Sequence, residues 1–572
     1  MNTHDVFNQS EPLTGVNLFL ANRPLRDALA LHAPGLDTAR LRALGAEVGS
    51  ADMQMHARLA NTHPPVLHTH DPVGRRIDEV EFHPSYHALL GRALHHGLHG
   101  TPWAAADVAT DAAGDVAVAD AAKEHAHVER AAAFMLFTEA EPSVLCPVSM
   151  SYAVMPALRA NAALHAAWGP KLAATAYDAR CLPMPQKSSV TIGMGMTEKQ
   201  GGSDVRANTT RAQADGTDAW GARFRLTGHK WFFSAPMCDA FLVLAQTSAG
   251  ISCFFMPRWL PDFVHDGARN AIRIQRLKHK LGNQANASSE VEFDGATAWL
   301  VGEAGRGVAQ ILAMGALTRL DCALGTAGLM RQALSIALHH TAQRQAFGKA
   351  LLNQPLMKNV LADLALESEA ATALALRLAV AVDRSEVDSG RQAHETVMRR
   401  LLTPVAKFWV CKRGSAFAQE AMECLGGNGY VEAEGAGVMA RIYREMPLNS
   451  IWEGAGNIMA LDLLRALRGA DVASVIETEC APARGAHVAF DHALDRVLLQ
   501  ADGVTAEAQA RRLAREVALV LQAALLFRQS PPAVFAAFCD SRLTGACDVF
   551  GLLGAAHDLD ALIHRAMPTE TP

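Results

Sequence analysis

One carboxylate in the C-terminal half of the chain stands between a bulky aromatic side chain and a glycine. Glu453 lies between Trp452 and Gly454 in the segment NSIWEGAGNIM. A carboxylate whose surroundings exclude water can remove a proton from a weakly acidic carbon, which is the work of a general base. The residues also allow a plainer interpretation, in which Glu453 lies near a helix N-terminus and is stabilised by the helix dipole.

A glycine-rich turn follows a β-type run in the middle of the chain. In the segment MGMTEKQGGSDV, the residues Gly201, Gly202, Ser203 and Asp204 predict a tight turn. Backbone N–H groups and hydroxyls in such a turn can approach a flavin or a phosphate closely. An ordinary Asp-containing β-turn has the same composition, so the turn is informative only together with other motifs.

Aromatic residues mark the end of the next β-type run. In LTGHKWFFSA, Trp231 and Phe232 precede Ser234. An aromatic wall and a hydroxyl suit a flavin ring, although a buried strand of a β core would account for the same residues.

A third group of residues lies in the helical half of the chain. In RQAFGKALLNQPL, Arg344 can pair with a pyrophosphate and Phe347 can cover an adenine or another ring face. In ECLGGNGY, Gly426 and Gly427 break a helix and permit close backbone contact. Separately, these residues are typical of a helix end and a surface arginine. Their order and spacing after the glycine-rich turn favour a cofactor site.

The elements that must position these residues can be recognised from apolar periodicity. Short β-type runs separated by Gly, Asp, Asn and Pro occupy the centre of the chain, and Ala- and Leu-rich segments with helical spacing flank them. We therefore expect an α+β fold that is mostly α. The predicted boundaries are 1–61 for an arm and helix, 62–187 for an N-terminal helical domain, 188–305 for a mainly antiparallel β domain, 306–467 for long helices with Glu453, and 468–572 for an appended helical domain.

The composition of the chain indicates which binding partners and which cellular compartment to expect. The formal net charge of −6 gives no global attraction to nucleic acid or acidic membranes. The ten cysteines show no zinc-like spacing, and the 24 histidines lack a supporting cysteine or carboxylate constellation, so we expect no metal site. The scattered cysteines fit a reducing cytoplasm, and the absence of a leader-like start or a long uncharged apolar stretch disfavours secretion and membrane spanning.

Taken together, the motifs T-E-x-x-x-G-S-D, K-x-x-x-S/T, R-x-x-F-G, L-G-G-x-G and Y/W-E-G resemble the acyl-CoA dehydrogenase family over about residues 85–465. The phrases MGMTEKQGGSDV, GHKWFFS and REMPLNSIWEGAGNIM look like its AidB-type branch, the alkylation-response flavoproteins. This resemblance implies the family's fold: an N-terminal helical domain, a central β domain and a C-terminal four-helix bundle, here with an extra helical domain.

The resemblance also implies an FAD cofactor shared between subunits. On the β domain, the residues that would hold FAD are Met194, Met196, Thr197, Gly202 and Ser203, with Ser234 near flavin N5. From a neighbouring subunit, Arg344, Phe347, Gln354 and Gly427 would grip the pyrophosphate and adenine, and Asn457 is also assigned to the cofactor. A homo-oligomer, in the family's manner a tetramer, is therefore expected.

The implied reaction is α,β-dehydrogenation of an acyl-CoA thioester, with Glu453 as the catalytic base and Arg319 as its orienter. Some family members place the base where Thr318 stands, and a threonine cannot serve as one. Trp452 adds bulk to the acyl pocket, which favours a short or branched acyl-CoA such as isovaleryl-CoA over a long straight chain.

Two alternatives remain open from the sequence. The resemblance to the AidB-type branch also implies an FAD-bearing protein of the alkylation response that binds double-stranded DNA and has weak or vestigial dehydrogenase activity. Arg511, Arg512, Arg515 and Arg528 could contact phosphates, although a solvated helix face would contain the same residues. An acyl-CoA or nitroalkane oxidase on the same fold would instead require fast reaction of the reduced flavin with oxygen.

Overall fold

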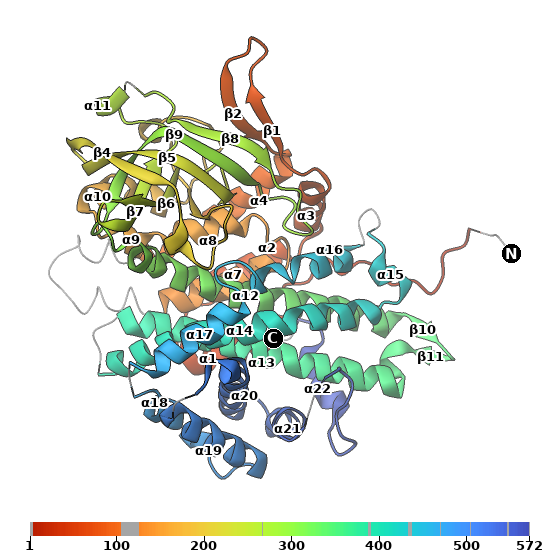
Figure 1. Cartoon of the computed structure of the whole chain (residues 1–572). Helices are drawn as coiled ribbons and strands as arrows, with labels where there is room; N and C mark the ends of the chain where they lie inside the picture. The colour runs from red at the N-terminus through yellow and green to blue at the C-terminus, as the bar shows by residue number, and fades with distance from the viewer. Residues whose placement is uncertain are drawn as a thin grey trace. The chain divides into compact units, whose positions relative to one another are not determined.

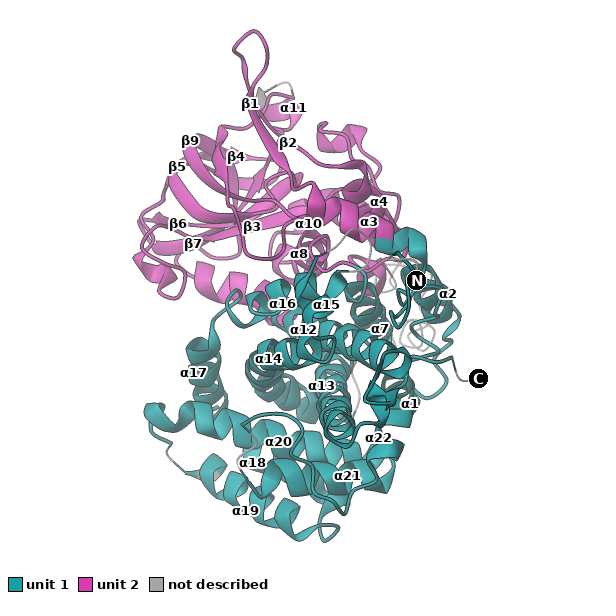
Figure 2. Cartoon of the chain, turned by 90° about the vertical axis from the view of Figure 1, so that its right-hand side faces the viewer, with its two compact units in different colours: residues 1–54, 123–140, 319–572 teal, residues 55–122, 141–318 magenta. Residues whose placement is uncertain are grey.

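The computed structural model describes residues 4–104, 125–265, 267–386, 390–432, 437–469, 471–503, 505–545 and 548–570. The chain divides into two compact units, which Figure 2 shows in different colours. Unit 1 comprises Met1–Gln54, Lys123–Ala140 and Arg319–Pro572, and unit 2 comprises Met55–Ala122 and Glu141–Thr318. The chain passes between the units several times, so neither unit is one continuous segment.

Unit 2 contains a large β sheet and short helices (Figure 1). Its helices are α4 (Pro84–His95), α8 (Leu145–Ala153), α9 (Met155–Leu158), α10 (Ala162–Ala173) and α11 (Asp262–His265). Its main strands are β3 (Ile192–Thr197), β4 (Arg211–Asp218), β5 (Gly221–Ser234), β6 (Ala240–Thr247), β7 (Gly250–Pro257), β8 (Ile272–Leu277) and β9 (Ser288–Val301).

The sheet of unit 2 closes on itself. Its order is β3-β5-β4-β6-β7-β9-β8, and additional pairings join β3 to β6 and β5 to β9. Only the pairings of β6 with β3 and with β4 are parallel, so the mainly antiparallel β domain is confirmed. Irregular register in β5, between Leu226 and Thr227 and again between Lys230 and Phe233, allows this long strand to bend. Closure leaves few unpaired edges along the strands.

Aromatic side chains pack the interior of unit 2. The ring centroids of Trp168 and Phe255, and those of Trp220 and Trp299, lie 4.9 Å apart. The indole N–H of Trp299 donates to Asp218 at 2.8 Å, so this buried polar group is satisfied. The strands that carry the predicted flavin residues are therefore fixed to a rigid core.

A hairpin lies where the sequence predicts a helical domain. Strands β1 (Val66–His70) and β2 (Arg76–Glu81) pair antiparallel, and Arg76 donates to the carbonyl of Ile274 in β8 at 2.9 Å. Most hairpin side chains are exposed or half-buried, so the segment lacks the apolar alternation from which a strand is recognised.

Unit 1 consists of helices and one small hairpin. Its helices are α1 (Arg23–His32), α2 (Ala39–Val48), α7 (Ala126–Thr138), α13 (Pro355–Glu386), α14 (Gln392–Glu423), α15 (Gly427–Tyr430), α16 (Val438–Glu445), α17 (Gly456–Leu467), α18 (Val472–Cys480), α19 (Val488–Asp502), α20 (Ala510–Gln529), α21 (Pro532–Phe538) and α22 (Leu559–Ala566). The hairpin is formed by β10 (Gln345–Ala346) and β11 (Lys349–Ala350). The unit boundaries fall within α3 (Ala51–Thr62) and α12 (Gly307–Gln343).

Helix α13 is the centre of unit 1, because its residues from Leu361 to Asp383 are buried on every side. Its buried charges pair with the C-terminal region. Arg542 contacts Glu367 at 3.1 Å and Arg565 contacts Glu369 at 2.8 Å. The residues predicted as an appended domain thus pack into the same compact unit as the long helices.

Helix α12 is the one described helix that is long and apolar enough to cross a membrane. However, 61% of its most apolar window is buried inside the protein, which is the situation of a core helix.

Candidate active site

Glu453 lies in a turn with an unusual backbone. Its φ is +58°, and that of Gly454 is +98°. A left-handed conformation costs a non-glycine residue about 1–2 kcal/mol, so it persists only where the surroundings hold it. The turn precedes α17, whose N-cap is Ala455, and Glu453 is half-buried. Glu453 therefore belongs to the connection before the helix and not to its first turn.

Arg319 of α12 contacts the backbone of this turn. Its Nε donates to the Glu453 carbonyl at 3.0 Å, and its guanidinium pairs with Asp462 of α17 at 3.1 Å. Arg400 of α14 also contacts Asp462, at 2.8 Å. The structure thus brings the predicted orienter and the predicted base together, through the backbone of Glu453.

Lys407 of α14 holds the carbonyls on either side of Glu453. Its Nζ donates to Trp452 O at 2.7 Å and to Gly454 O at 2.6 Å, and the residue is 1% exposed. Sequence reasoning missed this residue. A lysine within a long helical segment indicates a solvated face, and only the fold brings it to the carbonyl of Trp452, 45 residues further along the chain.

The predicted pocket residues are anchored by other contacts. The indole N–H of Trp452 donates to Asn449 Oδ1 at 2.9 Å, and Asn449 in turn donates to Thr326 at 3.1 Å, which fixes the plane of the indole. Thr318 belongs to unit 2, where it is buried and its hydroxyl donates to the Gly315 carbonyl at 3.1 Å.

In unit 2, the predicted flavin residues lie on two paired strands. Met194 of β3 is opposite Ser234 of β5, and Thr197 is opposite Phe232. Met196 lies between them on β3, and Phe232 remains 48% exposed. Lys278 lies 3.4 Å above the ring of the neighbouring Trp231. The pairing places hydroxyls and an aromatic wall side by side.

Gly202 and Ser203 lie next to the surface formed by β3 and β5, and the lack of a side chain at Gly202 lets a ligand approach the backbone closely. A Cβ on Gly202 would lie 2.4 Å from Thr197 Oγ1, so only glycine leaves that hydroxyl in place. Ser203 follows in the same turn and is exposed. A glycine cradle beside two hydroxyl-bearing strands fits the polar edge and the phosphates of FAD.

A buried ion pair supports the start of the glycine-rich turn. Lys230 Nζ contacts Glu198 at 2.7 Å, and both side chains are fully buried. Burial pushes the pKa of Glu198 upward, but the Lys230 ammonium and hydrogen bonds from Thr209 and Thr210 outweigh it and lower the pKa to about 2. Glu198 is therefore an anion that fixes the turn and is not available as a base.

The residues expected to reach a neighbouring subunit gather at one end of unit 1. Phe347 occupies the tip of the β10–β11 hairpin at φ +51°, followed by Gly348 at +78°, and is 96% exposed. Gln354 secures the hairpin by donating to Ala346 O at 2.7 Å. Gly427 opens α15, and the preceding Gly426 has φ +59°.

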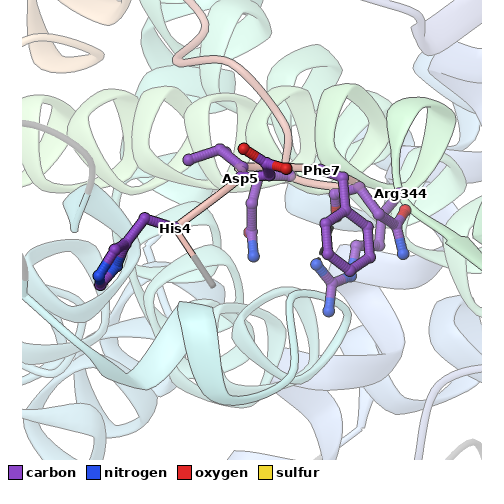
Figure 3. A pocket seen from close by; sticks show the side chains of 7 residues that line it. His4, Asp5, Phe7 and Arg344 are labelled. Atoms are coloured by element: carbon purple, nitrogen blue, oxygen red, sulfur yellow. Dashed lines mark hydrogen bonds between the residues drawn. The ribbon is translucent and has the colours of Figure 1, made fainter. Parts of the chain in front are cut away.

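The N-terminal arm, residues 4–11, contacts these same segments. Arg344 donates to the carbonyl of Asn8, and the side chain of Asn8 bonds both the N–H and the carbonyl of Gln345, at 2.7 and 2.9 Å. Gln9 accepts from Asn428 at 3.1 Å. An open pocket of about 440 Å³ lies between the arm and Arg344, and Figure 3 shows His4, Asp5, Phe7 and Arg344 around it. Sequence reasoning did not connect the arm with the cofactor residues.

Asn457 and the predicted DNA-contacting arginines are engaged within unit 1. Arg511 donates to Asn457 Oδ1 at 3.2 Å, and Arg515 lies 5.9 Å from the ring centroid of Trp409. Arg512 pairs with Glu516 at 2.9 Å and Arg528 with Glu479 at 3.3 Å. All four arginines lie on helix α20, with Arg528 in its last turn. Arg512 and Arg528 have carboxylate partners, whereas the partners named for Arg511 and Arg515 are neutral. DNA contact stays a prediction.

Comparisons with known proteins identify the family. The "Adaptive response protein AidB N-terminal domain" matches residues 8–179, the "Acyl-CoA dehydrogenase, middle domain" residues 193–296, and the "Acyl-CoA dehydrogenase, C-terminal domain" residues 305–468. The Escherichia coli (strain K12) protein AidB, named as an acyl-CoA dehydrogenase, is 45% identical over 95% of this chain and 94% of its own length. Acyl-CoA dehydrogenase family member 11 of Caenorhabditis elegans is 30% identical over 73% of this chain and 65% of its own.

A solved structure is similar over nearly the whole chain. ACDH-11 of Caenorhabditis elegans, in complex with C11-CoA, has a TM-score of 0.82 and 26% identity and covers 96% of this chain and 94% of its own. The predicted fold and family are thereby confirmed. The chain belongs to the acyl-CoA dehydrogenase family, in the branch with an AidB N-terminal domain, and is an FAD-dependent oxidoreductase.

Proposed function

We propose that the protein oxidises a short or branched acyl-CoA to the α,β-unsaturated thioester, with Glu453 as the base. The observation that carries this proposal is the turn around Glu453, in which a left-handed backbone is held by Arg319 and Lys407. A carboxylate kept in a strained conformation by surrounding contacts is typical of a functional site.

In this reaction, the Glu453 carboxylate removes the proton from Cα of the thioester. The electron pair left on Cα forms the double bond to Cβ as hydride leaves Cβ. FAD held by the residues of β3, β5 and the glycine-rich turn would supply the acceptor for that hydride. The backbone N–H of Glu453 can donate to the thioester carbonyl and so increase the acidity of the α-proton. Arg319 acts on neither proton nor hydride, and its contact with the Glu453 carbonyl keeps the carboxylate oriented.

The cofactor residues imply that a second copy of the chain takes part. Met194, Met196, Thr197, Gly202, Ser203 and Ser234 form one surface, on unit 2. Phe347 lies almost fully exposed at a hairpin tip of unit 1, where its ring is accessible to another molecule. We therefore propose that Arg344, Phe347, Gln354 and Gly427 contact the FAD of a neighbouring subunit in a homotetramer.

The proposed length of the substrate's acyl chain rests on the residues around Glu453. The indole of Trp452 is fixed by Asn449, so it cannot easily move aside for a long straight chain. Because the similar ACDH-11 structure contains C11-CoA, the substrate panel should run from isovaleryl-CoA and butyryl-CoA to an eleven-carbon thioester.

An anaerobic titration tests this function. Each acyl-CoA is added to the purified protein without oxygen, and the absorbance of the oxidised flavin is followed. We expect bleaching with short or branched thioesters, and its loss in Glu453→Gln at unchanged FAD content. Glu477→Gln, which neutralises an exposed carboxylate of α18, is the matched control. If no thioester bleaches the FAD-loaded protein, or if Glu453→Gln bleaches as fast as the parent, the proposal is wrong.

A further inference from the structure

Three consecutive carbonyls around Glu453 each accept a hydrogen bond from a cationic side chain. Arg319 contacts the Glu453 carbonyl at 3.0 Å, while Lys407 contacts the carbonyls of Trp452 and Gly454 at 2.7 and 2.6 Å. Hydrogen bonds from a charged donor are roughly twice as strong as neutral ones. The conformation of Glu453 is therefore held by three long-range hydrogen bonds from two residues, against its own backbone preference.

The charge of Lys407 is unusual for its location. The residue is 1% exposed, and no carboxylate pairs with it among the described residues. Arg319, by contrast, has Asp462 as a partner. Burying an ammonium without a counter-ion is unfavourable, and an apolar side chain of similar length would fill the same space at lower cost. Packing alone therefore does not explain a lysine at this position.

Lys407 and Glu453 both influence the pKa of the buried thiol of Cys322. Burial raises the pKa of Cys322, Lys407 acts against this increase, and Glu453 adds to it. Both charges therefore lie within electrostatic range of one side chain of α12. Arg319 and Arg400, which lie near this turn, both contact Asp462.

We infer that Lys407 is a positioning residue for Glu453. Its two hydrogen bonds fix the peptide plane before Glu453 and the plane that follows Gly454, while Arg319 holds the plane between them. The carboxylate then points in one direction. The inference rests on the proposed function, in which Glu453 is the base. A displacement of the base by about 1 Å can cost about 100-fold in rate, so this positioning matters for the chemical step.

The test compares Lys407→Met with a matched control, Lys171→Met. Lys171 also uses its ammonium to bind loop carbonyls, those of Met184, Pro185 and Lys187, but in unit 2. Steady-state kinetics use the acyl-CoA that bleaches the flavin, with and without deuterium at Cα. For Lys407→Met we expect kcat to fall by about 10- to 100-fold, KM to change by less than about threefold, and the α-deuterium isotope effect to increase. Lys171→Met should retain the parent's kcat and isotope effect.

Lys407→Arg provides a second variant if Lys407→Met does not fold. It keeps the positive charge but moves the donors, so a smaller fall in kcat with an increased isotope effect is expected. The inference is overturned if the folded variants have the parent's kcat and isotope effect while Glu453→Gln is inactive. If Glu453→Gln itself remains active, the proposed function fails instead, so the two failures can be distinguished.

Discussion

Gly202 and Thr197 show how closely single residues are fitted on the proposed cofactor surface. The hydrogen atom of Gly202 leaves the space in which the Thr197 hydroxyl sits, because a Cβ would approach Thr197 Oγ1 to 2.4 Å. The left-handed backbone of Glu453 likewise depends on single side chains, because hydrogen-bond donors from Arg319 of α12 and Lys407 of α14 hold it.

For Gly202→Ala, we expect the Kd for FAD to increase by about tenfold, which corresponds to about 1.4 kcal/mol. The added methyl group must displace the Thr197 hydroxyl from its place on the proposed flavin surface. Fluorescence titration of the apoprotein with FAD measures the change. Gly469→Ala is the control, because a Cβ there meets no atom within 4 Å. Equal FAD affinities in the two variants would contradict this account of the turn.

At the scale of elements, the N-terminal arm connects two motifs that are far apart in sequence. Asn8 bonds the start of the β10–β11 hairpin, and Gln9 accepts from Asn428 in α15. Ser10 and Glu11 contact the end of α12 through His340 and His339. The arm thereby restricts the residues that we propose to reach a neighbouring subunit's FAD.

Asn8→Ala is expected to weaken FAD binding by several-fold, because it removes two side-chain hydrogen bonds of about 1 kcal/mol each that hold the hairpin beside Arg344. Glu11→Ala is the matched control, since Glu11 bonds Gln343 and His339 through its backbone, which alanine keeps. FAD affinity and native mass are measured for both variants. Should the two variants bind FAD equally, the arm has no part in the cofactor site.

The C-terminal region is held to the long helices by buried charge. Arg542 is 3% exposed and contacts both Asp363 and Glu367 of α13. For Arg542→Met we expect a loss of about 3–5 kcal/mol in the free energy of unfolding, because the buried Asp363 loses its counter-ion and Glu367 keeps Arg413 alone. Arg512→Met, which removes an exposed pair with Glu516, should cost at most about 0.5 kcal/mol. Urea unfolding measures both, and a small loss in Arg542→Met would disprove this role.

At the scale of the whole molecule, buried titratable groups make stability depend on pH in opposite directions. Burial, with neighbouring arginines, lowers the pKa of His32 to about 3. The unfolded chain therefore binds a proton that the folded chain does not, and stability is lost as pH falls from about 6.5 toward 3. Burial raises the pKa of Glu139 to about 8, so its contribution is complete below about pH 4.5 and is lost as pH rises toward 8.

Two variants separate these contributions between pH 4.5 and 6.5. His32→Leu should make the slope of unfolding free energy against pH more negative by about 1.4 kcal/mol per unit, and Glu139→Gln should make it more positive by about the same amount. Denaturant unfolding at several pH values gives both slopes. Slopes that match the parent's in both variants would show that neither group titrates as described.

The sequence by itself determined the family, the α+β class and the identity of the candidate base. Local patterns suffice for these properties, because a motif such as WEG or GGSD, and the change from helical to β-type periodicity, lie within short stretches of chain. The pairing of Met194 with Ser234 and the contact of Arg319 with Glu453 agree with what those motifs imply.

Only the tertiary structure decided which distant residues serve the site and how the chain is divided. Lys407 reaches the Glu453 turn, Asn8 reaches Arg344, and Arg542 reaches α13 across long separations in sequence. Each of these side chains, read locally, is an ordinary polar residue of a helix or an arm. Their partners are set by packing of elements around α13, and such packing leaves no periodic signal in the residues that it brings together.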